Sequence, residues 1–208
     1  MSLVSAVISD IRIEINDTES TRFSNDTTVI LPIVKQAIRR ANRVCQRAGL
    51  HFAKKSAAIT CTANQAYATA PTDLDIPLGL YRDDTHEEIV QIGEGDWETM
   101  YSGQSPLLYW FNDVQNGRVL FNGTPTSATA LTMWYFPLID PSAYTTASTM
   151  PWGGRLDDVI VKYVALRIQN LEEMDVTVDM SILKDMEVSI IETYQPQNPT
   201  AIAGKGWL

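Results

Sequence analysis

Apolar positions along the chain follow two periods, which divide it into helical and strand-forming stretches. Across residues 30–48 apolar side chains recur at the three- and four-residue spacing of one helix face, and Gly49 follows where many helices end. The same spacing predicts an earlier helix over residues 3–15, with Ser2 as a candidate N-cap. The pattern leaves open whether Pro32 kinks the second helix or begins it.

After His51 the apolar period changes from 3.6 to two, which is typical of strands. Residues 57–62 alternate in this way, and residues 66–70 are predicted to return as their hairpin partner. Pro71, Pro77 and Gly79 predict irregular backbone in the segment that follows. Further short strands, separated by Asn-Gly turns, complete a predicted antiparallel sheet or small sandwich: residues 88–92, 107–111, 118–121 and 131–136.

Helical period returns at Arg155, and two helices are expected with a break near residues 175–179. The order is therefore two helices, a β region, two helices and a tail rich in proline and glycine. Pairs of apolar helices on either side of a β region would best bury their stripes against one another. The predicted fold class is α+β: residues 1–55 and 150–194 form a four-helix core, residues 56–149 an inserted antiparallel sheet region, and residues 195–208 an extended C-terminal tail.

Composition narrows the classes of protein to consider. Hydrophobic residues make up 45% of the 208, but no apolar run approaches the roughly 20 residues needed to span a bilayer. The N-terminal segment alternates apolar and charged residues instead of showing a signal-peptide pattern. We therefore expect neither secretion nor membrane insertion. The two cysteines, Cys45 and Cys61, have no metal-ligand spacing and are predicted to be reduced core residues.

Charge is unevenly distributed along this acidic chain, whose net charge is −9. Residues 22–55 carry eight basic side chains against one acid, whereas residues 172–192 carry seven acids against one lysine. Such asymmetry indicates either a nucleic-acid patch or two faces that meet within or between subunits. The candidate subunit-interface residues are Lys35, Arg39, Arg43, Arg47, Glu172, Asp179 and Glu187.

Reactive groups for catalysis are sparse. His51 and His86 are not spaced as a metal pair, and the nucleophile-elbow, P-loop and zinc-protease motifs are absent from the sequence. The acids of residues 93–98 (GEGDWE) fit a solvated turn better than a calcium loop. A carboxylate-based hydrolase centred on residues 93–98 is thus the weakest alternative, and it would require a metal-dependent activity that is lost on mutation of Asp96 or Glu98. We expect a protein that is not an enzyme and needs no metal or cofactor.

The main alternative function uses the basic stripe of the second helix, where Lys35, Arg39, Arg43 and Arg47 recur every four residues. Positioned cations of this kind can contact phosphates, so the stripe is compatible with a nucleic-acid-binding protein. An isoelectric point near 4.6 argues against a dedicated DNA binder.

Several segments together carry a family resemblance. They are the basic helix at residues 33–48, the aromatic stretch from Pro106 through Tyr109, Trp110 and Phe111, the RVLFNGTP segment at 118–125, the LTMWYFPL strand at 131–138, and Met150-Pro151 leading into the helix at 157–168. Over roughly residues 7–194 this arrangement resembles the head-to-tail adaptor (connector) proteins of tailed bacteriophages.

The resemblance implies a structural virion protein of a phage or prophage, without catalytic residues. Such a protein would be made in the bacterial host cytoplasm and would assemble as a homo-oligomeric ring beneath the portal, twelve-fold in the virion, while the free protein could be a monomer. Its partners would be the portal protein, the next tail or stopper protein, further copies of itself, and DNA that passes through the channel without sequence recognition. The expected portal-docking residues are Tyr194, Pro196, Trp207 and Leu208.

Overall fold

The computed structural model describes residues 2–20, 22–23, 25–99, 107–171 and 175–194. It is a mixed α+β structure that divides into two compact units. A helical unit combines Met1–Ala53 with Ile139–Leu208, and a β unit comprises Lys54–Leu138. The helical unit is therefore built from two stretches of chain that are far apart in sequence.

Helices α1 (Val4–Glu14) and α2 (Leu31–Arg47) form where the apolar spacing predicts them. Pro32 lies in the first turn of α2, so it begins the helix and does not kink it. A π-helical turn at Asp26–Ile30 precedes α2, and the side chain of Asn25 caps that turn. The prediction of Ser2 as the cap of α1 is wrong, because its hydroxyl hydrogen-bonds the carboxylate of Asp157.

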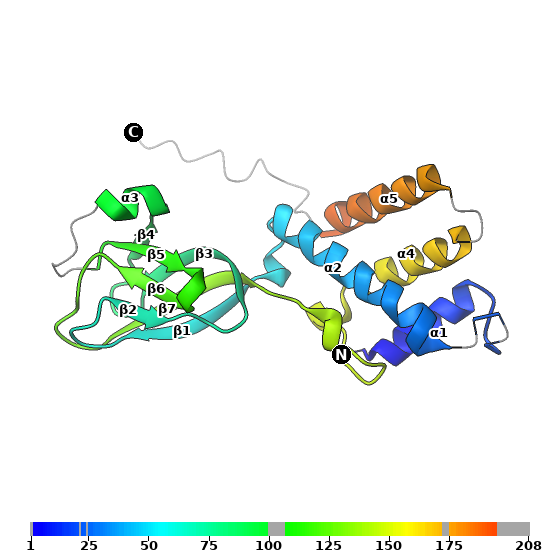
Figure 1. The fold of residues 1–208 in the computed structure, drawn as a ribbon, viewed down its shortest axis with the longest axis horizontal. Helices are drawn as coiled ribbons and strands as arrows, with labels where there is room; N and C mark the ends of the chain where they lie inside the picture. Colours follow the sequence, from blue (N-terminus) through cyan, green and yellow to red (C-terminus); the bar gives the residue numbers. More distant parts are fainter. Residues whose placement is uncertain (1, 21, 24, 100–106, 172–174, 195–208) are drawn as a thin grey trace. The chain divides into compact units, whose positions relative to one another are not determined.

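Helices α4 (Asp157–Asn170) and α5 (Val176–Tyr194) complete the helical unit, and the break between them falls slightly before the predicted one. Helix α4 packs against α1, α2 and α5, and α2 also contacts α5 (Figure 1). The apolar stripes of these helices face one another, which removes their side chains from water. Fully buried members include Val7, Ile11, Val34, Ile38, Ile160, Val164 and Ile190.

A buried ion cluster fixes the connection between α1 and α2. The guanidinium of Arg12, on the buried side of α1, lies 2.9 Å from the Asp17 carboxylate, and its Nε donates to Asp26 at 2.8 Å. Arg12 also donates to the carbonyl of Phe23 at 2.7 Å. Arg12 and Asp17 are only 7% and 3% exposed, so their ion pair compensates two charges that are both removed from water.

The described residues of the β unit form a seven-stranded sheet in the order β1-β7-β3-β4-β5-β6-β2. Its first and last strands, β1 and β2, also contact each other, so the sheet curls around the core. Trp110, Tyr135 and Phe121 are the largest side chains in that core, and the indole of Trp110 donates to the Ile89 carbonyl at 2.9 Å. The strands are β1 (Lys55–Cys61), β2 (Tyr67–Thr69), β3 (Leu74–Arg82), β4 (Glu88–Gln91), β5 (Tyr109–Asp113), β6 (Arg118–Phe121) and β7 (Thr129–Pro137).

The pairing corrects three predictions for the sheet. Strand β2 pairs with β6 and not with β1, so the predicted hairpin is wrong. Strands β4 and β5 pair in parallel, whereas the sheet was expected to be antiparallel throughout. The segment predicted to be irregular forms β3, whose ladder with β7 tolerates Pro77 and Gly79 through register shifts at Leu74/Ile76 and Pro77/Gly79.

The GEGDWE segment is also different from its prediction. Glu94–Thr99 form the short helix α3, with Glu94 and Asp96 in its first turn. Acidic side chains at that end interact favourably with the helix dipole, which favours a helix where a solvated turn was expected.

Candidate functional site

The outer face of α2 carries the predicted basic stripe. Its apolar residues point into the helical unit, which leaves Lys35, Arg39, Arg43 and Arg47 on the opposite side. Arg39, Arg43 and Arg47 are exposed, and Lys35 is half-buried. The sequence pattern therefore placed this stripe correctly on the surface of one helix.

Half of this stripe contacts a single segment of the same chain. Lys35 donates to the carbonyl of Ser142 at 2.8 Å, and Arg39 Nη2 lies 3.6 Å from Asp140 Oδ1. The Asp140 carboxylate also accepts hydrogen bonds from the backbone N–H and hydroxyl of Ser142. These bonds, with a smaller contribution from Arg39, lower the pKa of Asp140 below its usual value.

The predicted acidic partners on α5 also meet arginines of their own chain. Glu187 lies 3.9 Å from Nε of Arg40, which is too long for a hydrogen bond, and Asp179 forms an ion pair with Arg167. Asn170 donates a further hydrogen bond to Asp179 at 2.7 Å. The bond from Arg167 is the largest cause that lowers the pKa of Asp179.

The structure thus brings together residues that sequence reasoning did not pair. Arg40 belongs to the same basic cluster as the stripe, but nothing in the sequence distinguishes it as the partner of Glu187. Arg167 lies on α4, far from that cluster in sequence, and only the packing of α4 against α5 reveals its role. Within the described residues, Arg43 and Arg47 have no ion pair.

Four arginines surround one hollow of about 250 Å³ between α2, α4 and α5. They are Arg39, Arg40, Arg43 and Arg167, and we call this site the arginine hollow. Nε of Arg40 is buried and has no hydrogen-bond partner in the part of the chain that is described. An unsatisfied guanidinium donor in such a hollow favours an oxyanion, because carboxylates and phosphates accept from the guanidinium fork.

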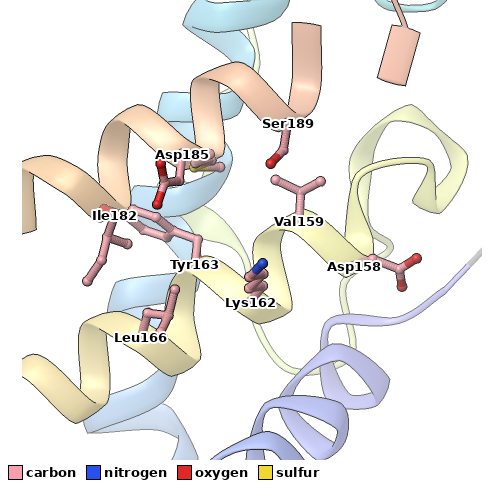
Figure 2. A pocket seen from close by; sticks show the side chains of 9 residues that line it. Asp158, Val159, Lys162, Tyr163, Leu166, Ile182, Asp185 and Ser189 are labelled. Atoms are coloured by element: carbon pink, nitrogen blue, oxygen red, sulfur yellow. The ribbon is translucent and has the colours of Figure 1, made fainter. Parts of the chain in front are cut away.

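A second, mainly apolar hollow lies between α4 and α5, as Figure 2 shows. This α4–α5 groove has a volume of about 170 Å³, and Val159, Leu166, Ile182 and Met186 provide its apolar lining. Asp158, Asp185 and Lys162 supply its charged groups. Tyr163 borders both hollows, and burial is the main cause that raises the pKa of its hydroxyl.

The predicted portal-docking residues divide into two groups. Tyr194 ends α5, where its ring lies 4.7 Å from that of Phe52 and its hydroxyl hydrogen-bonds the carbonyl of Arg155. The structure therefore assigns Tyr194 to contacts within the helical unit. Pro196, Trp207 and Leu208, together with the interface candidate Glu172, lie outside the described residues.

Other candidate sites carry less chemistry. The described ranges contain no group of three or more His, Cys, Asp or Glu side chains arranged to hold a metal ion. Both cysteines are free and buried, as predicted. None of the described helices is long and apolar enough to cross a membrane.

Comparison with known proteins identifies the family. The model of the SU10 adaptor protein family matches residues 2–186, which is most of the chain. The chain belongs to this family of phage head-to-tail adaptors. No curated protein sequence matches it. The family match confirms the resemblance found in the sequence, and it makes the protein a structural component of a bacteriophage.

Proposed function

We propose that this adaptor assembles as a ring beneath the portal, extends the DNA channel and joins the capsid to the tail. The family match over residues 2–186 is the observation that carries the proposal. The net charge of −9 supports it, because an acidic ring would repel the phosphate backbone and would not retain passing DNA. Its partners are then the portal protein, the next tail or stopper protein and further copies of the adaptor in the virion.

We also infer that α1, α2, α4 and α5 act as one four-helix core from which the β region is inserted. The mutual packing of these helices supports this inference. In a ring, the core offers the basic face of α2 to a neighbour. Lys35 and Arg39 already contact their own chain, so Arg43 and Arg47 are the stripe residues most available for that contact.

The C-terminal tail is the proposed latch to the portal. Tyr194 contacts Phe52 and the carbonyl of Arg155, so the end of α5, which directly precedes residues 195–208 in sequence, is held to the helical unit. Trp207 and Leu208 are suitable apolar anchors, since a few large side chains provide most of the affinity of an interface.

The experiment combines the purified adaptor with its cognate portal protein and images the mixture by electron microscopy. The full chain should form a second ring stacked on the portal, and a variant lacking residues 195–208 should fail to do so while retaining its circular-dichroism spectrum. Absence of a complex with the full chain at all concentrations tested would contradict the adaptor ring. A truncated chain that binds the portal as well as the full chain would refute the latch alone.

A nucleic-acid-binding function remains the second candidate because the arginine hollow could accept a phosphate. It predicts DNA affinity that falls steeply with salt, with a log–log slope that becomes shallower in an Arg43→Gln, Arg47→Gln variant. Fluorescence anisotropy with duplex DNA measures that slope. Affinity that is undetectable at low salt would exclude this function.

A further inference from the structure

The arginine hollow has one uncompensated positive charge. Three of its four arginines have a carboxylate neighbour in the same chain: Arg39 with Asp140, Arg40 with Glu187, and Arg167 with Asp179. The fourth, Arg43, is exposed, and no ion pair involves it within the described ranges. The hollow is therefore matched to a single additional carboxylate, whereas a DNA duplex would bring several phosphates close to the three carboxylates already present.

The α4–α5 groove has the opposite residual charge. Its two aspartates, Asp158 and Asp185, outnumber its one lysine, Lys162. Both aspartates are exposed, and neither makes an ion pair or a hydrogen bond in the part of the structure that is described. In Figure 2 the groove lies between the two helices, with Asp185 on α5 and Asp158 at the start of α4.

The two surfaces are also complementary in their apolar parts. Ile182 and Met186 provide buried surface in the groove, and Val159 and Leu166 are only half-buried there. Met180, which is 62% exposed, lies on the same face of α5 as Leu183 of the arginine hollow, three residues away. An unbranched methionine adapts to an irregular apolar groove better than most side chains do.

We propose that the arginine hollow of one copy docks on the α4–α5 groove of a second copy. Arg43 then pairs with the partner copy's Asp185, and Met180 inserts between the partner's α4 and α5. This inference rests on the proposed ring and specifies its subunit contact. Because two different surfaces meet, the contact is heterologous and can repeat from copy to copy, as a ring requires.

A charge-exchange experiment tests this contact. Arg43→Glu and Asp185→Lys variants are each mixed with the cognate portal, alone and together, and ring formation is counted by electron microscopy. Each variant alone should reduce ring yield about tenfold, because residues 43 and 185 then carry charges of the same sign at every contact. The equimolar mixture should return to within about twofold of the wild type, since alternating copies restore an ion pair at every contact.

Matched controls separate this effect from a change in net charge. Lys54→Glu and Glu88→Lys make the same charge changes at exposed positions of the β unit, and both should assemble like the wild type. Met180→Ala should lower ring yield without a charge change, and circular dichroism verifies that every variant is folded.

The outcomes distinguish the two levels of the proposal. A wild-type chain that forms no ring on the portal contradicts the proposed function. If the wild type forms rings and the single variants assemble equally well, the contact proposed here is wrong. If the single variants fail and their mixture fails too, the pairing of Arg43 with Asp185 is refuted.

Discussion

Replacing Arg12 by methionine should strongly destabilise the helical unit. The guanidinium donates to Asp17, Asp26 and the carbonyl of Phe23, and methionine retains only its apolar stem. The Asp17 side chain is 1% exposed, so its carboxylate would stay buried after losing the bond from Arg12, while keeping those from the backbone N–H groups of Arg22 and Phe23. Removing one partner of a buried ion pair usually lowers the free energy of unfolding by about 3–5 kcal/mol. Asp26, at 41% exposure, should contribute no more than about 1 kcal/mol.

Urea denaturation followed by circular dichroism measures these differences as shifts in midpoint at constant slope. Asp26→Asn is the matched control, with an expected loss below about 1 kcal/mol. An Arg12→Met, Asp17→Asn double variant should recover part of the loss, because it no longer buries a carboxylate that has lost the Arg12 guanidinium. The reasoning fails if Arg12→Met loses less than about 1.5 kcal/mol, or if the double variant is less stable than the single one.

Three further predictions follow from buried polar groups. Burial is the main cause that raises the pKa of Asp157, so the folded state holds its proton more tightly and stability should fall as pH rises above about 4. The melting temperature of the Asp157→Asn variant should not show this decrease with rising pH. A pH profile identical to that of the wild type would contradict the prediction. Burial raises the pKa of the Cys45 thiol to about 12 and also raises that of Cys61, so a thiol reagent should label both only after unfolding. Tyr135→Phe removes a 2.7 Å hydrogen bond to Asp73 and should reduce stability to urea by about 1 kcal/mol; no change would exclude a net contribution.

Helices were predictable from the sequence because their signal is local. The apolar spacing of residues 30–48 and the change of period after His51 are visible within one short window each, and both correspond to observed elements. Strand pairing is not local. Nothing near Tyr67–Thr69 indicates that β2 pairs with β6, about fifty residues later, instead of with its neighbour β1.

The candidate site was predictable only in part, for the same reason. Periodicity placed Arg39 and Arg43 on the outer face of α2, but the partners of the arginines depend on how three helices pack. Arg167 shows this clearly, because its ion pair with Asp179 joins two helices whose relative position no sequence pattern specifies. One indication of the buried Arg12 cluster is present in the sequence, because Arg12 is a charged residue on the apolar side of α1.

The pairing of β1 with β7 also bears on how the chain folds. These strands begin and end the β unit, and Lys55 lies opposite Tyr135, so both junctions with the helical stretches are held side by side. A flexible insert of about 80 residues would oppose the meeting of the two helix pairs by on the order of 4 kcal/mol of loop-closure entropy. Once its sheet has formed, the β unit acts as a short, closed connection. During synthesis the β unit can fold before α4 and α5 leave the ribosome. The start of α4 is then held close to α1 and α2 when the two C-terminal helices form.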